Sequence, residues 1–368
     1  MGELGAGALY GPERFSHFGL QPTVTTQLLG RRLVVALGLG LAVFAGLSVY
    51  ADINAMRQAV LRFPWELFIP ILGLTFFNYL LRFGKWSFYL RCLGIRGLPL
   101  ADSFLVFFGG LAMVITPGKV GEWLKSYLLE RYTGVPFART APIVVAERLT
   151  DGLALLLLAA GGLARFGIGV PVAVGVVLLA AAVVGLSLNR RAGDLAAALV
   201  ERLPVVGRYA GWVREFHGGA AVLFQPANLA VATVIGLVSW SGECLAFYLV
   251  LRGLGAADGV DLAVTGAFIL SVASLGSSLM LSPGGLGIAE GGITGLTQLL
   301  VGLPPAEAAV AALLIRLGTL WFGVSVGTAA LALLMARDRD YLKGSSSSSN
   351  SSSSAKESSE YTPTSRPW

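Results

Sequence analysis

The stretch that organises this chain runs from Ile115 to Gly152 and reads ITPGKVGEWLKSYLLERYTGVPFARTAPIVVAERLTDG. It contains a Thr-Pro-Gly break at 116–118, the acidic residue Glu122 soon after the break, and Arg148 inside a later apolar segment. Proline and glycine interrupt a helix, and a charge inside an apolar segment is costly in a membrane. A breaker, an acid and an arginine in this order are therefore a distinctive feature of the chain.

The same order occurs a second time. From Leu281 the chain reads LSPGGLGIAEGGITGL, and Arg316 lies inside a later apolar segment. Pro117 and Arg148 are 31 positions apart, and Pro283 and Arg316 are 33 positions apart. Breaker, acid and arginine in matched order predict an internal repeat, which affects the interpretation of the whole fold.

The composition indicates an integral membrane protein. The chain has 368 residues, of which 55% are hydrophobic and 13% are charged; a soluble domain has roughly 25% charged residues. The mean hydropathy is +0.73. Such a chain crosses the membrane as α-helices, which satisfy their own backbone hydrogen bonds.

Cysteine, histidine and charge usage exclude several classes of function. Cys92 and Cys244 lie in separate apolar segments, and His17 and His217 lie in polar stretches. This spacing supports neither a disulfide framework nor a metal site, so we expect no metal and no cofactor. The net charge of +6 is spread over loops, which suits membrane orientation better than nucleic-acid binding.

The apolar segments predict an all-α polytopic protein with about six full spans and about 8–10 membrane helices, because a span needs roughly 20 apolar residues. The predicted spans are Leu33–Tyr50, Trp65–Tyr79 with its continuation to Gly94, Pro136–Ala164, Val170–Leu188, Ala227–Leu251 and Pro305–Met335.

Two further segments are predicted to form re-entrant helical hairpins around the Pro-Gly breaks. The first has a short arm, Phe104–Ile115, with Asp102 and Ser103 as the N-cap, and a second arm that ends near Tyr132. In the other hairpin, Asp261 caps an arm that runs to the second break. Two short full spans are the alternative for the first hairpin.

The distribution of Lys and Arg predicts that both termini lie in the cytoplasm and that the two units are inverted. Repeat 1 covers about 33–164 and repeat 2 about 170–335, within a transmembrane domain of 31–338. The connection 189–225 has an amphipathic leucine stripe and is predicted to lie on the cytoplasmic membrane surface; a packed soluble helical pair is the alternative. The tail 1–30 and the Ser-rich tail 339–368 are expected to be loosely ordered and disordered, respectively.

The two buried arginines are the main candidate site. Arg148 lies 12 residues past Pro136, and Arg316 lies 11 past Pro305; this places each arginine about 16–18 Å into a core roughly 30 Å thick. One interpretation is a pair of structural clamps, Arg148 with Glu122 or Glu147 and Arg316 with its own acid. The other, which the matched positions favour, is a midplane site for lipid phosphate.

The remaining candidates fall into three groups. The glycines at the breaks would let a phosphate approach the backbone at a helix start, although close helix packing explains any single one of them better. Buried acids would pair with the arginines. For one of them, Glu243, a hydrogen bond that serves only packing and a role as proton carrier explain the residue equally well. The predicted glycines are Gly118, Gly121, Gly284, Gly285 and Gly287; the predicted acids are Glu122, Glu147, Asp151, Glu243 and Glu290; the predicted headgroup or interface residues are Arg82, Lys85, Trp86 and Lys125.

These motifs resemble a known family. The segments PGKVGE…AERLTDG and SPGGLGIAE…IRLG, with RFGKW at 82–86, are similar to the lysylphosphatidylglycerol synthase transmembrane region, also called the flippase-like domain family. The resemblance covers roughly residues 30–338. It implies a membrane domain that moves an aminoacylated lipid between leaflets, with relatives beside or fused to glycosyltransferases. The residues after 338 cannot form the soluble aminoacyl-transferase domain of the full-length synthases.

We therefore expect a plasma-membrane lipid flippase, not an enzyme, whose cargo is a phospholipid or a polyprenyl-phosphate-linked lipid. Its partners would be membrane lipids and a glycosyltransferase or lipid synthase, and not nucleic acid. One alternative is an intramembrane enzyme that acts on a lipid headgroup with Glu122, Glu147 and Asp151 as its acids. The other is a non-transporting scaffold for a membrane glycosyltransferase or synthase.

Overall fold

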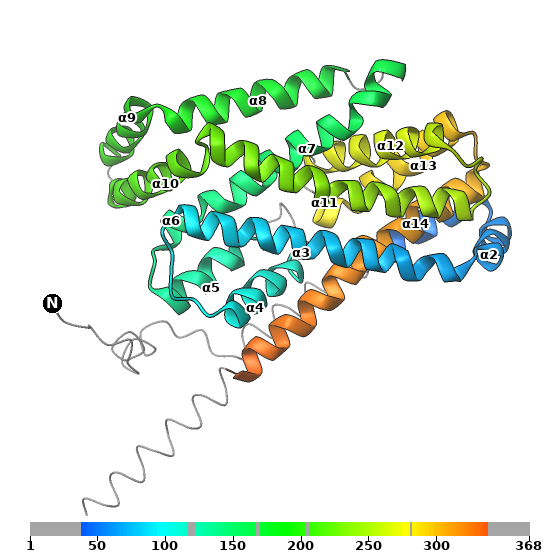
Figure 1. The fold of residues 1–368 in the computed structure, drawn as a ribbon, viewed down its shortest axis with the longest axis horizontal. Coiled ribbons are helices and arrows are strands. Elements are labelled where there is room, and N and C mark those ends of the chain that lie inside the picture. The colour runs from blue at the N-terminus through cyan, green and yellow to red at the C-terminus, as the bar shows by residue number, and fades with distance from the viewer. Residues whose placement is uncertain (1–37, 117–121, 167–169, 204–205, 280–281, 338–368) are drawn as a thin grey trace, which may run out of the picture.

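A computed structural model describes residues 38–116, 122–166, 170–203, 206–279 and 282–337. Every regular element in these ranges is a helix (Figure 1). Both tails and the tip of the first Pro-Gly break, with Pro117, Gly118 and Gly121, lie outside the described residues. The predicted all-α class is confirmed for the described part of the chain.

The helices follow one another with short connections. After an initial helix, Gly38–Ala51, the order is α2 (Ile53–Arg62), the single turn η2 (Trp65–Leu67), α3 (Phe68–Cys92), α4 (Leu100–Leu111), α5 (Leu124–Thr133), α6 (Phe137–Thr140), α7 (Pro142–Phe166), α8 (Val170–Leu188), α9 (Arg190–Glu201), α10 (Ala210–Leu223), α11 (Pro226–Gly253), α12 (Val260–Leu279), α13 (Ile288–Val301) and α14 (Pro305–Arg316). A π-turn, η6 (Leu317–Trp321), joins α14 to a further helical stretch that ends at Arg337.

Several of these helices are long and apolar enough to cross a membrane. Among the described residues there are four such helices, or up to six if two bent helix pairs each count as one span. The protein is thus a multi-pass membrane protein, as predicted. The four are Trp65–Cys92, Pro226–Gly253, Val260–Ser278 and Pro305–Arg337; the bent pairs are Gly38–Ala51 with Ile53–Arg62, at 102°, and Ala173–Leu188 with Arg190–Glu201, at 80°.

The arms of the two predicted hairpins differ in length. In the first unit, α4 has 12 residues and α5 has 10, which corresponds to about 18 and 15 Å. In the second unit, α12 has 20 residues and α13 has 14, or about 30 and 21 Å. The arms of the first unit are thus too short to cross, whereas α12 is long enough to do so.

The predicted N-caps at Asp102 and Asp261 are wrong. The helix α4 begins at Leu100 after Pro99, and α12 begins at Val260, so both aspartates lie inside the first turn. A carboxylate there is stabilised by the helix dipole without being the cap. Each aspartate instead accepts a hydrogen bond from an arginine at the end of another long helix.

These two contacts link the predicted units reciprocally. Arg337, at the end of the second unit, donates to Asp102 of the first at 3.3 Å. Arg165, at the end of the first unit, donates to Asp261 of the second at 2.7 Å. The helices pack in the same crossed pattern. The helix α7 of the first unit packs on α12 of the second, and the last helical stretch of the second unit packs on α4 of the first.

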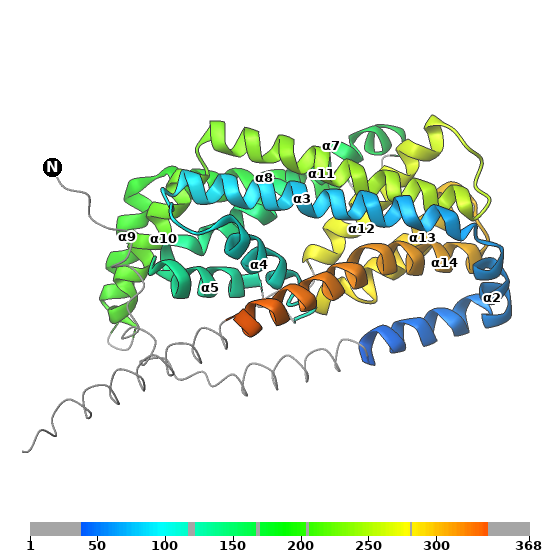
Figure 2. The same cartoon turned by 60° about the horizontal axis from the view of Figure 1, so that its bottom comes forward.

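The long helices α3 and α11 pack on each other and run side by side in both views (Figures 1 and 2). One is the second span of the first predicted unit, and the other is the corresponding span of the second unit. Equivalent elements of the two units therefore contact each other, and the exchanged contacts Arg337–Asp102 and Arg165–Asp261 join other helices.

Residues next to the two breaks meet inside the bundle. Ile115 precedes the first break, and Leu286 belongs to the second; together with Leu320 and Val324 they form a small buried apolar cluster. A Cβ on Gly284 would lie 3.6 Å from the side chain of Ile115. The end of the described α4 segment thus contacts the second break directly.

The amphipathic connection is helical, as predicted. The helix α9 turns by 80° from the helix before it, and its stripe leucines Leu195 and Leu199 are 62% and 54% exposed. The helix α9 does pack on α10, where Gly193 lies against His217, but the leucine stripe stays outside this contact. An exposed apolar stripe on a helix at the end of a membrane bundle suits the predicted position on the membrane surface.

The two ends of the bundle carry different amounts of positive charge. Figures 1 and 2 place α6, α9 and α10 at one end, and α2 with the α11–α12 connection at the other. The first is the end that we predict to face the cytoplasm. Arginines of the first end, and of the segments leading to it, are Arg131, Arg139, Arg190, Arg191, Arg202, Arg208 and Arg214; those of the second are Arg57, Arg62, Arg165 and Arg252.

The contact between α4 and the last helical stretch depends on a glycine, which gives a first prediction. A Cβ on Gly327 would lie 2.3 Å from the backbone nitrogen of Ala112, so Gly327→Ala forces two helices apart. We expect a loss of about 1–3 kcal/mol in stability, measured as thermal unfolding in detergent. Gly295→Ala is the control, because no atom lies within 4 Å of the added Cβ. Equal stability of the two variants would contradict the observed packing.

Candidate functional site

Polar residues lie midway along the long helices, between two apolar clusters. On α3, Ile71 belongs to one apolar cluster and Trp86 to the other, with the buried Asn78 between them. On α11, the buried Glu243 lies between Ala232 and Phe247 in the same way. We call this region the central polar layer. Its members are Asn78, Arg82, Lys85, Glu122, Lys125, Glu147, Arg148, Asp151, Ser239, Glu243, Glu290 and Arg316.

The first arginine of the layer forms a two-point contact with an acid. Arg148, on α7, donates from Nε to Oε2 of Glu122 at 2.8 Å and from its Nη2 to the other carboxylate oxygen. A guanidinium that meets a carboxylate at both oxygens forms one of the stronger polar contacts in proteins. The sequence left two partners open for Arg148, and the observed partner is Glu122.

The second arginine repeats this arrangement. Arg316, at the end of α14, donates from Nε to Oε1 of Glu290 at 2.7 Å. The acid and the arginine are 26 positions apart, as are Glu122 and Arg148. The two units therefore share both the pair and its spacing.

The second pair also involves the break itself. The other oxygen of Glu290 accepts from the backbone N–H of Gly287 at 2.7 Å, and the Nη2 group of Arg316 donates to the carbonyl of Gly284. Both glycines have positive φ, 60° for Gly284 and 86° for Gly287, a backbone conformation that side chains disfavour. The backbone N–H at this helix start was predicted to bind an anion. In the structure it donates to the carboxylate of Glu290.

In both pairs the arginine is more exposed than the acid. The side chains of Arg148 and Arg316 are 33% and 16% exposed, whereas those of Glu122 and Glu290 are 4% and 3% exposed. Each acid is therefore buried behind its arginine. The arginine side chain is thus the more accessible partner of each pair.

Two lysines form a second set of buried ion pairs. Lys125 Nζ lies 2.5 Å from Glu147 Oε2, and Lys85 pairs with Asp151. Arg82 Nη2 lies 3.4 Å from the other oxygen of Asp151. The predicted acids Glu147 and Asp151 are thus each held by cations.

The predicted interface position of Lys85, Trp86 and Lys125 is wrong. They are 1%, 0% and 6% exposed, respectively, and lie inside the bundle. Trp86 donates from Nε1 to Ser103 at 3.2 Å, and the ammonium of Lys125 lies 5.2 Å from the centre of the Trp86 ring. The lysines are buried because Glu147 and Asp151 on α7 supply opposite charges at the same depth.

The acid Glu243 has a different kind of partner. Asn78 donates from its side-chain amide to Glu243, and Ser239 donates to the amide oxygen of Asn78. These three residues connect α3 and α11. Sequence reasoning singled out Glu243 but not Asn78; the signal was a lone amide inside an apolar segment, where polar side chains are rare.

A tyrosine beside this group contacts the π-turn that follows Arg316. Tyr79 donates from its hydroxyl to the carbonyl of Thr319 at 2.6 Å. A π-turn changes the register of a helix, and such turns occur frequently at functional sites. Tyr79 was also missed by sequence reasoning, since an isolated tyrosine in a span is usually packing.

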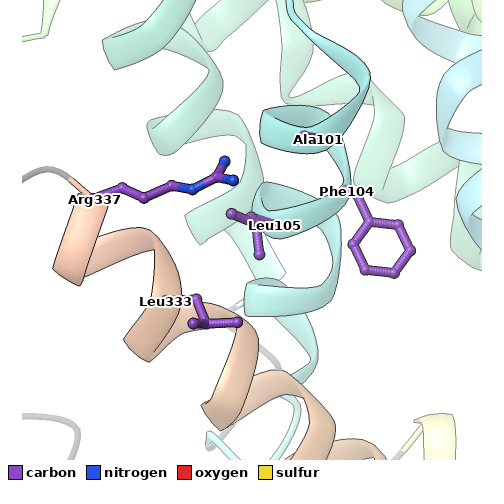
Figure 3. Close-up of a pocket in the computed structure, with 5 residues that line it drawn as sticks. All are labelled: Ala101, Phe104, Leu105, Leu333 and Arg337. Atoms are coloured by element: carbon purple, nitrogen blue, oxygen red, sulfur yellow. The ribbon is translucent and has the colours of Figure 1, made fainter.

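An open groove lies away from the central polar layer. It has a volume of about 210 Å³ and lies between the start of α4 and the end of the last helical stretch (Figure 3). Figure 3 shows Arg337 reaching across it toward α4, with Leu333 beneath. The groove is at an end of the bundle, and it is lined by Ala101, Phe104, Leu105, Leu333 and Arg337 rather than by predicted site residues.

Fold and site together define a class: a multi-pass helical membrane protein with paired charges in the middle of its bundle. Residues 35–327 match the family described as the lysylphosphatidylglycerol synthase TM region. This chain belongs to that family, as its motifs predicted. The matched range contains both arginine–glutamate pairs and the helices α3 and α11.

A curated relative is the protein named glycosyltransferase AglD from Haloferax volcanii. It is 27% identical over 264 residues, which cover 61% of this chain and 42% of the relative. The chain thus spans less than half the length of that relative.

Proposed function

We propose that this protein moves a lipid with a phosphate-containing headgroup between the two leaflets. The observation that carries this proposal is the repeated arginine–glutamate pair beside a break in each unit. The cargo is a phospholipid or a polyprenyl-phosphate-linked lipid, and the protein performs no chemistry on it. Membership of a family named for lysylphosphatidylglycerol synthase and the similarity to a glycosyltransferase-named protein support a lipid-related role.

The chemistry of the pairs suits a phosphate. A guanidinium offers paired donors that match carboxylate and phosphate oxygens equally well. Glu122 and Glu290 hold the same donors that a phosphate would take. The exchange of carboxylate for phosphate keeps each arginine paired, which matters because a bare charge at the bilayer centre costs at least about 2.5–3.5 kcal/mol.

We further propose that the two units are inverted repeats whose breaks meet near the bilayer midplane. The equal 26-residue spacing of the pairs supports this, as do the exchanged contacts Arg337–Asp102 and Arg165–Asp261. In the proposed orientation both termini face the cytoplasm and the protein resides in the plasma membrane. Alternating exposure of the two arginines then follows from rocking of one unit against the other.

A second candidate function is a scaffold for a membrane glycosyltransferase. The observation that favours it is the similarity to a glycosyltransferase-named protein of which this chain spans 42%. In this case the protein would bind lipid or enzyme without moving lipid.

Reconstitution separates these functions. Purified protein is placed in liposomes of phosphatidylcholine and phosphatidylglycerol that contain fluorescent phosphatidylglycerol, and a membrane-impermeant quencher reports the outer leaflet. We expect loss of the protected inner-leaflet signal well above that of protein-free liposomes. Unchanged signal with unchanged lipid would favour the scaffold, and a modified headgroup in mass spectrometry would favour an enzyme.

A further inference from the structure

Glu243 differs from every other buried acid of the central polar layer. Within the described residues, Glu122, Glu147, Asp151 and Glu290 each form an ion pair with lysine or arginine. Glu243 is 7% exposed and has no such pair there. Its hydrogen-bond partner is a neutral amide.

That amide is held in one orientation. Ser239 donates to the side-chain oxygen of Asn78, so the NH₂ group of Asn78 points toward Glu243. An amide NH₂ can donate to a carboxylate and, more weakly, to the carbonyl oxygen of a neutral carboxylic acid. The site is therefore satisfied in both protonation states of Glu243, whereas a lysine or arginine partner would fix the ionised state.

The surrounding charges connect Glu243 to both halves of the site. The charges that act on Glu243 are those of Arg82 on α3, Asp151 on α7 and Arg316 at the end of α14. Tyr79, which follows Asn78 on α3, bonds to the turn just after Arg316. Arg82 is also a partner of Asp151, and Arg316 is the partner of Glu290. A change of charge on Glu243 therefore acts on an arginine of the proposed phosphate site.

We propose that Glu243 is a proton-binding site that couples proton movement to the proposed lipid movement. This inference rests on the proposed function. When ionised, the carboxylate attracts Arg316 and competes with phosphate. When it takes a proton from water on one side, an O–H bond forms and its competing charge disappears, so phosphate then has to replace only Glu290 as the partner of Arg316. Release of the proton to the other side restores the carboxylate and weakens the hold.

The burial of Glu243 gives this switch its strength. Coulomb interactions in a protein interior are several times stronger than in water, because the effective dielectric is far lower. An isolated ionised carboxylate is also costly there. Because of both effects, the position in which a nearby arginine is stable depends on whether Glu243 carries its charge.

The test is lipid movement under an imposed pH difference. Proteoliposomes of phosphatidylcholine and phosphatidylglycerol, with fluorescent phosphatidylglycerol, are diluted into buffers that do or do not differ from the internal pH. We expect wild type to move lipid several times faster with one sign of the pH difference than with none. We expect Glu243→Gln to lose this response, because it keeps the shape and the hydrogen bond of the acid but binds no proton. The control, Glu215→Gln, changes an exposed acid on α10 and keeps the response.

The outcomes distinguish this inference from the function on which it rests. Wild-type lipid movement without a response to the pH difference, or a full response in Glu243→Gln, overturns the proton site alone. No lipid movement in wild type overturns the proposed function and the coupling with it. If Glu243→Gln does not fold, a pH-sensitive dye trapped in wild-type proteoliposomes decides: an imposed lipid asymmetry should change the internal pH, and a constant pH would overturn the coupling.

Discussion

Replacing Arg148 or Arg316 with alanine is expected to lower the lipid flip rate in proteoliposomes by at least about tenfold. A hydrogen bond to a charged group contributes about 1.5–3 kcal/mol, and 1.4 kcal/mol corresponds to a factor of ten. Each arginine offers more than one such bond, and the two side chains are the exposed partners of their pairs. Loss of either should therefore remove one of the two proposed holding positions. Mass spectrometry should show less phosphate-containing lipid co-purified with the variants.

Conservative variants separate binding from structure at this site. Arg148→Lys keeps the charge but not the planar fork, so we expect it to fold and to lose most transport. Glu122→Gln removes the competing carboxylate, so we expect it to retain bound lipid and to bind it more tightly. Arg214→Ala is the control, because Arg214 forms an exposed pair with Glu201 on the surface of the bundle.

A wild-type flip rate in both alanine variants would contradict this prediction. If Arg148→Ala and Arg316→Ala are monodisperse and flip lipid at the wild-type rate, both arginines are structural clamps. The repeated pair then explains stability only, and the proposed mechanism fails.

Replacing Lys125 with methionine is expected to destabilise the protein by about 3–5 kcal/mol, because a buried ion pair that loses one partner leaves an uncompensated charge. Lys125 and Glu147 have side chains only 8% and 4% exposed. Methionine retains most of the apolar stem of lysine, which packs against Gly110, so the effect arises from charge rather than volume. Thermal unfolding in detergent measures it.

The double variant gives the specific readout. Lys125→Met with Glu147→Leu removes both charges and should recover most of the lost stability, since apolar replacement of a complete buried pair is often neutral or stabilising. Breaking the exposed pair Arg214–Glu201, whose side chains are 55% and 60% exposed, should change stability by only about 0–1 kcal/mol. A double variant no more stable than Lys125→Met would show that the pair is not coupled.

Much of the fold follows from one-dimensional features of the sequence. Apolar length predicted the membrane helices, and the breakers at Pro283 and Gly284 predicted the interruption between α12 and α13. These features act locally, because a helix is formed and ended by residues close together in the chain. The predicted helix starts were less accurate. Asp102 and Asp261 lie inside the first turn rather than at the cap, because an acid is favourable at both positions.

The motif order also identified the residues of the site, but not their partners. The matched order of breaker, acid and arginine, in Ile115–Gly152 and again after Leu281, is enough to single out Arg148 and Arg316. Two acids were open as partners of Arg148. Adjacent residues on a helix point about 100° apart, so Glu147 cannot readily meet its neighbour and instead reaches Lys125, while Glu122 on another segment meets Arg148.

Residue order and hydropathy are enough to predict a helical membrane protein with two matched breaks, each followed by an acid and an arginine. The packing of the helices settles which charges neutralise one another and which buried acid, among the described residues, has no cation as its partner. Asn78 and Glu243 are 165 positions apart and meet because α3 packs along α11. Lys85 is buried because α7 brings Asp151 to the same depth. Hydropathy treats each segment alone, whereas a buried charge is stable only where another segment supplies its partner.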